Sequence, residues 1–280
     1  HSFPTRRSSD LRAAAETIPG LRGREAVLER FFERVGVRER HLALPVEGYA
    51  ALRGMEARGR AFLEVGTALG ERCLRQLFEA AALHPGEVDL LSTTTVTGIA
   101  VPSLDARLMN RLPFDPSLKR VPLFGLGCLG GAAGLARTAE YLRAFPDELA
   151  VFLSVELCSL TLQRDDASTA NVVSSGLFGD GAAAVLLAGA RHPLARARQS
   201  APRVVASRAA FFPNTERVMG WDVVDDGFKV VLDPEVPTVV RREVPPAVDV
   251  FLADHGLERD VIAIWVTYPG GPKVLDALAE

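Results

Sequence analysis

Apolar positions recur along this chain with helical spacing in some segments and as short β-branched or apolar runs in others. The helical spacing predicts helices over residues 24–35, 58–83, 103–112, 129–144 and 237–255. The short runs predict strands over residues 88–96, 121–126, 149–156, 203–210 and 261–266, and one more within 177–188. A polar segment at 165–175 is expected to start a further helix, and residues 268–276 a turn into another. Because helices and strands alternate, we expect an α/β layered fold.

The chain divides, on its composition, into two halves and a short leading segment. Residues 191–202 are polar and contain proline, which predicts a link between a half at 12–190 and a half at 191–280. Residues 1–11 have no clear periodicity and read as an in-frame translation of a sequencing-adapter oligonucleotide. We therefore interpret them as non-native and leave them out of the fold prediction.

The overall composition excludes several classes of function. The chain has 280 residues, 48% of them hydrophobic, and a net charge of −3, which does not favour a nucleic-acid partner. Its three cysteines are widely spaced without a CxxC pair, which argues against a zinc site or a disulfide framework. We therefore expect a reducing compartment, the cytoplasm, and no metal. No apolar run is long and uncharged enough to span a membrane.

Cys128 has the most informative surroundings of any residue. An apolar strand at 121–126 runs into a glycine-rich turn that carries the cysteine, and a helix of small residues follows. This order places the thiol at a helix N-terminus, where unpaired N–H groups and the helix dipole favour a negative charge. Such a setting lowers the pKa of a thiol and predicts a nucleophile. The alternative is a buried structural cysteine in a tight turn.

Four ordered motifs resemble those of the type III polyketide synthases, the chalcone and stilbene synthase superfamily. They are Gly127-Cys128-Leu-Gly130-Gly131, Glu156-Leu-Cys158-Ser, Leu177-Phe178-Gly-Asp180-Gly-Ala-Ala and Trp265-x-x-Tyr268-Pro-Gly-Gly-Pro272. Residues 36–41 also look like the N-terminal signature of the bacterial members. The resemblance covers about residues 24–280.

The resemblance implies a thiolase-type αβαβα layered sandwich of two similar halves, and a homodimer. It also implies a reaction, in which an acyl-CoA starter is loaded onto the cysteine and condensed with the enolate from decarboxylated malonyl-CoA. The partners are then acyl-CoA and malonyl-CoA as substrates, with no separate cofactor. The Glu-Leu-Cys-Ser variant and the small pocket residues look like members that make alkylpyrones or alkylresorcinols from fatty acyl-CoA starters.

The resemblance also implies roles for individual residues. Cys128 matches the nucleophile, and Val101 the position that reaches across the dimer interface. Positions that shape the pocket match Phe178, Cys158, Thr161 and Val230. Arg30 and Arg34 match positions that bind CoA. Judged on the residues alone, Phe178 would be core packing, the two arginines would be solvated surface charges and Asp180 would fix a turn.

The chain departs from the family in two respects. The family's catalytic histidine stands directly before Pro-Gly-Gly-Pro, and here that position is Tyr268. A phenol with a pKa near 10 donates a hydrogen bond but forms no imidazolium–thiolate ion pair. The family's catalytic asparagine lies in a C-terminal segment that the chain lacks. We therefore expect an incomplete second half with exposed apolar surface, and no activity from the 280 residues alone.

Two other functions remain open at this point. A ketoacyl synthase III-like enzyme uses the same catalytic set of Cys, His and Asn but is primed from an acyl carrier protein. The Pro-Gly-Gly-Pro context argues against this alternative. A non-catalytic thiolase-fold protein would bind acyl-CoA or scaffold a partner, and Tyr268 is the feature in its favour.

Overall fold

The computed structural model describes the chain except for residues 1–2, 7–17, 19–24, 38, 269 and 280. Most of the segment interpreted as non-native, and Pro269 of the last motif, therefore lie outside the described residues. The chain forms two compact units, and each is described by itself. The first unit comprises His1–Pro4, His41–Thr161 and Gly179–Ser207. The second unit comprises Thr5–Arg40, Leu162–Phe178 and Arg208–Glu280.

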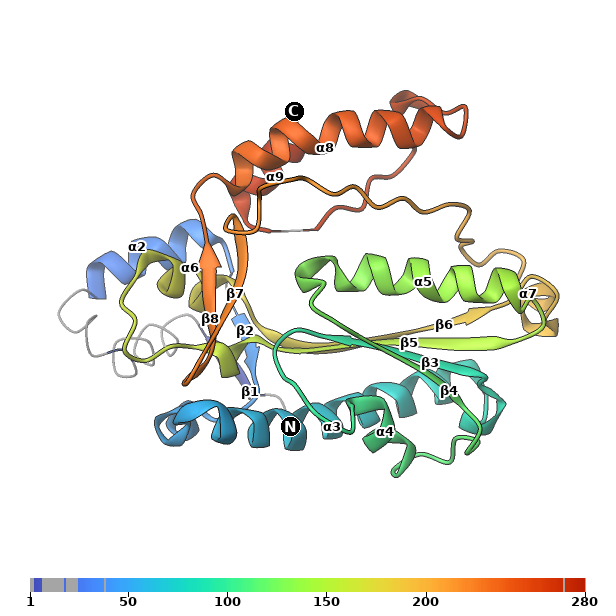
Figure 1. The fold of residues 1–280 in the computed structure, drawn as a ribbon, viewed down its shortest axis with the longest axis horizontal. Coiled ribbons are helices and arrows are strands. Elements are labelled where there is room, and N and C mark those ends of the chain that lie inside the picture. Colours follow the sequence, from blue (N-terminus) through green and yellow to red (C-terminus); the bar gives the residue numbers. More distant parts are fainter. Residues whose placement is uncertain (1–2, 7–17, 19–24, 38, 269, 280) are drawn as a thin grey trace. The chain divides into compact units, whose positions relative to one another are not determined.

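The first unit is built on a four-stranded sheet in the order β4-β3-β5-β6. Its strands are β3 (Leu90–Thr95), β4 (Lys119–Phe124), β5 (Leu149–Leu157) and β6 (Asp180–Ala188). β3 runs parallel to both β4 and β5, and β6 runs antiparallel to β5. In Figure 1, α3 (Gly54–Ala81) and α4 (Leu104–Met109) lie on one face of this sheet and α5 (Gly130–Ala144) on the other. The unit is therefore a three-layered α/β/α arrangement.

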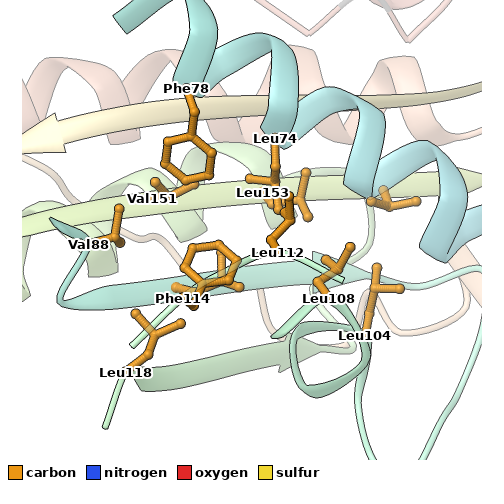
Figure 2. Packing of buried hydrophobic residues seen from close by; sticks show 12 residues of the cluster. Leu74, Phe78, Val88, Leu104, Leu108, Leu112, Phe114, Leu118, Val151 and Leu153 are labelled. Atoms are coloured by element: carbon orange, nitrogen blue, oxygen red, sulfur yellow. The ribbon is translucent and has the colours of Figure 1, made fainter. Parts of the chain in front are cut away.

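The main core of this unit lies between α3, α4 and the sheet. Figure 2 shows Leu74 and Phe78 of α3 facing Val151 and Leu153 of β5, with Leu108 of α4 beside them. β5 lies between two strands and under helices on both faces, so nearly all of its residues are buried. This position explains why the sequence of β5 is mostly apolar rather than alternating, with Ser154 and Glu156 as its polar residues.

α5 approaches the other face of the sheet unusually closely because small residues face the strands. A Cβ atom added at Gly134 would lie 2.0 Å from the ring of Phe152 in β5, which is far inside van der Waals contact. Leu142, one of the buried residues of α5, packs with Leu90 and Ala150 of the sheet. Glycine at position 134 therefore sets how near the helix lies to the strands.

The second unit contains the remaining long helices and a hairpin. Its elements are α2 (Glu25–Val35), α6 (Thr169–Leu177), β7 (Met219–Val224), β8 (Gly227–Leu232), α8 (Val236–Ala253), η6 (Arg259–Val261) and α9 (Pro272–Ala279). α2 packs on α6, α6 on β8, and α8 on α9. A separate two-stranded sheet is formed by β1 (Phe3–Arg6) and β2 (Glu39–Leu42). Short elements complete the first unit: η2 (Val46–Ala51), η3 (Pro85–Glu87), η4 (Gly127–Leu129), η5 (Cys158–Thr161) and α7 (Pro193–Ala197).

Most of the predicted helices and the strands up to residue 188 are confirmed, but two predicted strands are wrong. Residues 203–210 and 262–267 have no regular secondary structure, although both contain several apolar residues. A strand needs a hydrogen-bonded neighbour, and no described strand pairs with either segment. Val205, Ile264 and Val266 are accordingly 80%, 78% and 93% exposed. The expected exposed apolar surface is therefore present in the described residues.

The hairpin β7–β8 is an element that the sequence prediction left as irregular chain. Val224 pairs with Gly227, which leaves a two-residue loop of Asp225 and Asp226 between the strands. Gly227 follows this loop with φ at +113°. An Asp-Asp-Gly turn between β-branched runs is a recognisable hairpin signal. The two compact units alternate along the chain, so they do not test the boundary at residues 190 and 191, which stays a prediction.

The close approach of α5 predicts a strong difference between two of its glycines. Gly134→Ala forces a methyl group into the Phe152 ring, so we expect it to lower the free energy of unfolding by about 1–3 kcal/mol. Gly131→Ala is the control, because its Cβ would meet nothing within 4 Å. It should be neutral or stabilising by about 0.5–1 kcal/mol. Urea unfolding curves measure both, and equal effects of the two variants would contradict the packing.

Candidate functional site

The thiol of Cys128 lies on a short turn that joins β4 to α5. The turn is η4 (Gly127–Leu129), and α5 begins at the next residue, Gly130. Gly125 and Gly127 have φ values of +85° and +55°, so the chain passes through the left-handed region twice before the cysteine. Cys128 itself is exposed. The predicted strand, turn and helix around Cys128 are confirmed.

The start of α5 is held against the end of β3 by another close contact. A Cβ atom at Gly130 would lie 2.8 Å from the hydroxyl oxygen of Thr94, a residue that is almost fully buried. The first turn of a fifteen-residue helix is thus fixed beside the cysteine. The N–H groups of Leu129 and Gly130 already donate to carbonyls of the preceding turn, so the helix dipole is what would stabilise an anion here. Cys128 thus has the position beside a helix start that the sequence predicted, and its role as a nucleophile stays a prediction.

A second thiol, that of Cys158, lies at the same edge of the sheet. β3, β4 and β5 run parallel, so the turn after β4 and the turn after β5 both follow carboxyl ends of strands. Burial raises the pKa of the Cys158 thiol far above its usual range, and the negative charges of Glu156, Asp180 and Cys128 raise it further. Cys158 therefore stays a neutral thiol. The structure thus places an exposed cysteine and a buried, protonated cysteine at one edge of the sheet.

Glu156 is a site residue that the sequence reasoning quoted but gave no role. Its carboxylate accepts hydrogen bonds from the backbone N–H of Val96 at 3.0 and 3.1 Å. It also accepts from the hydroxyls of Thr97 at 2.7 Å and Thr95 at 3.3 Å. Burial raises the pKa of Glu156 despite these donors. The sequence did contain a signal for this residue, because Glu156 is the single charged residue in a mostly apolar strand.

Asp180 holds a turn through its side chain, in line with the interpretation made from the sequence. Its carboxylate accepts hydrogen bonds from the backbone N–H of Ser159 at 2.8 Å and from the Ser159 hydroxyl. The Ser159 hydroxyl also lies 2.5 Å from the hydroxyl of Tyr49. Burial, followed by the charge of Asp180, raises the pKa of Tyr49 to about 12.

Two further predicted site residues belong to the first unit. Thr161 is buried in η5, and its hydroxyl donates a hydrogen bond of 2.7 Å to the carbonyl of Cys158. Thr161 and Cys158 are thus brought together on one turn. Val101 lies in the loop between β3 and α4 and is 92% exposed.

The second unit contains the other predicted pocket residues. Phe178 ends α6, and its ring meets Trp221 of β7 edge to face at a centroid distance of 6.5 Å. Its carbonyl accepts a hydrogen bond of 2.8 Å from Arg40, which belongs to the predicted N-terminal signature. Val230 is a buried residue of β8. A buried amide pair supports this region, because Asn171 hydrogen-bonds the backbone of Gln163, whose own amide donates to Phe228 of β8.

Tyr268 and the two arginines are also in the second unit. Tyr268 precedes α9 and is 48% exposed, and its carbonyl accepts from the N–H of Gly270. Arg30 and Arg34 lie exposed on α2, and Arg30 also donates to the carbonyl of Ala26. Their position suits an anionic ligand and equally suits plain solvation.

Two absences hold for the part of the chain that the structure describes. No group of three or more His, Cys, Asp or Glu side chains there is arranged to hold a metal ion. None of the helices found there combines the length and apolar character needed to cross a bilayer. The predicted cytoplasmic location stays a prediction.

Comparisons with known proteins point to one family. Residues 25–211 match the family described as FAE1/Type III polyketide synthase-like protein. A 1,3,6,8-tetrahydroxynaphthalene synthase of Streptomyces peucetius subsp. caesius is 50% identical over 255 residues, which cover 91% of this chain and 67% of that protein. A 1,3,6,8-tetrahydroxynaphthalene synthase of Streptomyces griseus is 31% identical, with coverage of 100% and 72%. The chain thus spans about two thirds to three quarters of these relatives.

Solved structures agree with the sequence relatives. The 1,3,6,8-tetrahydroxynaphthalene synthase of Streptomyces coelicolor A3(2), a bacterial type III polyketide synthase, is similar with a TM-score of 0.89 and 27% identity. The match covers 99% of this chain and 77% of that one. The PKS-I structure from the brown alga Ectocarpus siliculosus matches with a TM-score of 0.88 and 24% identity, which supports the fold alone. The predicted thiolase-type α/β fold is confirmed.

The environment of Glu156 predicts a change in how stability depends on pH. Folding raises the pKa of this carboxyl, so between pH about 4.5 and its folded pKa the folded protein holds a proton that the unfolded chain has released. The contribution of Glu156 to stability therefore falls as pH rises through this window. The side chain in Glu156→Gln is neutral at every pH. The free energy of unfolding of this variant, relative to that of the wild type, should therefore increase as pH rises above about 4.5. Urea unfolding at a series of pH values tests this, and parallel profiles for the two proteins would contradict it.

Proposed function

Because the chain belongs to the type III polyketide synthase family, whose members are acyltransferases that condense malonyl-CoA into polyketides, we propose that Cys128 carries the acyl group. The family uses CoA thioesters as substrates and needs no separate cofactor. In the proposed cycle the Cys128 thiolate attacks an acyl-CoA thioester, and CoA leaves. Malonyl-CoA then loses carbon dioxide, and the resulting enolate carbon attacks the acyl group and releases the thiolate.

The observation that carries this proposal is the difference between the two thiols at the edge of the sheet. Cys128 is exposed beside the start of α5, whereas burial and neighbouring carboxylates keep Cys158 protonated. A thiolate has to attack the thioester and later leave from one, so only Cys128 fits the task. Cys158 and Thr161 then serve as walls for the acyl chain, as do Phe178 and Val230. Arg30 and Arg34 are proposed to contact the phosphates of CoA.

Tyr268 occupies the position of the family's histidine and limits what this site achieves. Its phenol supplies one hydrogen-bond donor for a thioester oxygen on which the enolate charge develops. A phenol forms no imidazolium, so the start of α5 is left as the main stabiliser of a Cys128 thiolate. We therefore propose a slow enzyme, whose rate a histidine at this position would raise.

The two candidate product classes differ in the CoA substrates that they require. The relatives from Streptomyces peucetius and Streptomyces griseus are named for 1,3,6,8-tetrahydroxynaphthalene, whose fused rings carry no alkyl chain. Two-carbon units from malonyl-CoA alone can supply such a skeleton. The alkylpyrone or alkylresorcinol products expected from the Glu-Leu-Cys-Ser motif require a long acyl-CoA starter. At 50% identity to one such relative, we favour the naphthalene-type product for this chain.

One alternative is favoured by a specific observation. The tyrosine at position 268 is compatible with a non-catalytic thiolase-fold protein that binds acyl-CoA without condensing it. The two functions differ in whether Cys128 becomes acylated and whether the acyl group is then extended.

An acylation and product assay tests the proposal on the protein expressed from the complete gene. We expect mass spectrometry to find the acyl group on Cys128, and Cys128→Ala to abolish both acylation and product. Tyr268→His should raise the condensation rate by about 10²-fold or more, because it restores an acid–base group. Malonyl-CoA alone should give the naphthalene-type product, whereas a requirement for long acyl-CoA would assign the pyrone or resorcinol type.

Two outcomes of the same assay would contradict it. Absence of polyketide with either the wild type or Tyr268→His, while Cys128 is acylated or protected by acyl-CoA, would favour the binding protein. Acylation of Cys158 in the Cys128→Ala protein, with product formation retained, would show that the nucleophile is misassigned.

We also propose that the protein is a homodimer, with Val101 at the contact between the subunits. Val101 is 92% exposed and Ile99, in the same loop, is 49% exposed. Two exposed aliphatic side chains on one loop are the kind of surface that a second subunit covers.

Val101→Asp should weaken the dimer, because a carboxylate would be buried at the contact. We expect the dissociation constant to rise about tenfold or more, equivalent to ~1.4 kcal/mol. Size-exclusion chromatography with light scattering over a range of concentrations measures it. Val223→Asp is the control, since Val223 of β7 is also exposed at 68%. A monomeric wild type, or equal effects of both variants, would contradict the assignment.

A further inference from the structure

The turn that carries Cys158 is tied down by side chains from several distant segments. η5 spans Cys158–Thr161, directly after β5. The hydroxyl oxygen of Ser159 lies 2.5 Å from the Tyr49 hydroxyl and accepts from the backbone N–H of Ala43 at 3.4 Å. Asp180 accepts from both the N–H and the hydroxyl of Ser159. Ser159 is therefore the point where η2, the chain before it, η5 and β6 meet.

The hydrogen bonds around Ser159 have a fixed direction. A carboxylate only accepts, so the single hydroxyl proton of Ser159 goes to Asp180. Tyr49 must then donate to Ser159, and it accepts in turn from the N–H of Leu44 at 3.2 Å. The pKa of Tyr49, which burial raises to about 12, keeps that proton on the phenol. The chain thus runs from Leu44 through Tyr49 and Ser159 to Asp180 with each hydroxyl donating once.

The other residues of the turn are fastened as well. Arg58, which is only 5% exposed, donates a hydrogen bond of 2.6 Å to the carbonyl of Leu160. Thr161 donates to the carbonyl of Cys158. The backbone of this four-residue turn is therefore held at several points, which fixes where the side chains of Cys158 and Thr161 leave it.

We propose that Ser159, oriented by Asp180 and Tyr49, is a positioning residue that holds Cys158 and Thr161 in place and thereby sets which polyketide is made. The inference rests on the proposed function, in which Cys158 and Thr161 form a wall for the growing chain. Ser159 acts through its two neighbours and touches no reacting atom. Wall position decides chain length and folding of the intermediate, because both depend on the space available to it.

Removing the Ser159 hydroxyl should loosen the turn that carries Cys158. Ser159→Ala leaves the Tyr49 hydroxyl and one oxygen of Asp180 without their shared partner in a largely buried place. Unpaired buried polar groups are costly, so the turn should open locally to let water reach them. Cys158 would then become accessible while the core between α3 and the sheet remains intact.

The experiment compares Ser159→Ala with the wild type in the protein from the complete gene. Rates of thiol alkylation, followed by peptide mass spectrometry, report the accessibility of Cys158. Cys73 is an internal control, because it lies on α3, packs against the main core, and has its pKa raised by burial too. We expect Cys158 to be alkylated about tenfold faster or more in the variant while the rate at Cys73 is unchanged. The ratio of products should shift, with total turnover changed by less than the ratio.

Matched variants separate positioning from general destabilisation. Ser159→Thr keeps the hydroxyl and should restore both the slow alkylation of Cys158 and the wild-type product ratio. Ser92→Ala removes another buried serine hydroxyl of the same unit, which donates to the carbonyl of Val121, and should change neither. If Ser159→Ala fails to fold, Tyr49→Phe removes one donor from the same chain of hydrogen bonds and is measured instead.

Each outcome decides a part of the proposal. Unchanged Cys158 alkylation in Ser159→Ala overturns the positioning role. Faster alkylation with an unchanged product ratio overturns the link to the product. If Ser92→Ala changes the Cys158 alkylation rate and the product ratio as much as Ser159→Ala does, loss of any buried hydroxyl has this effect. The specific role of Ser159 would then be overturned. Should the wild type make no polyketide, the proposed function fails, and the alkylation rates still decide whether Ser159 positions Cys158.

Discussion

The close approach of α5 to the central strands is the constraint on which the site depends. At Gly130 and Gly134 the helix backbone lies so near Thr94 and Phe152 that no side chain fits between them. The helix can start only where the strands allow it, which places its first turn at the carboxyl edge of the sheet. Cys128 stands directly before that turn. A packing requirement between backbone and side chains thus produces an electrostatic setting for a thiolate.

The same edge of the sheet places its two cysteines in different environments. Cys128 is exposed to solvent at a helix start, whereas Cys158 is surrounded by protein and by the carboxylates of Glu156 and Asp180. Both carboxylates are themselves occupied by backbone N–H groups and hydroxyls, which hold them in place. Negative charge near a buried thiol disfavours its ionisation. One edge therefore holds an exposed thiol and a buried thiol that stays protonated.

Prediction from the sequence succeeded where local patterns decide the structure. The strand before Cys128, the glycine turn and the helix after it followed from apolar periodicity and small residues, and the four motifs identified the family. It failed at residues 203–210 and 261–266, where apolar runs carry strand propensity but meet no neighbouring strand. It also missed the hairpin β7–β8, although the Asp-Asp-Gly turn was visible between its two runs. Strand formation depends on a partner, and periodicity within one segment contains no information about that partner.

The sequence by itself determined the family, because membership depends on residue identity in ordered motifs. The same motifs predict Cys128 as the nucleophile and place Tyr268 where the family has histidine, and both assignments stay predictions. Only the tertiary structure decided the role of Glu156, the direction of hydrogen bonding through Ser159 and the protonation of Cys158. These properties arise between residues far apart in the chain, such as Tyr49 and Ser159, which are 110 positions apart. Shifts of pKa and hydrogen bonds depend on distances and burial. They therefore arise only when folding brings those segments together.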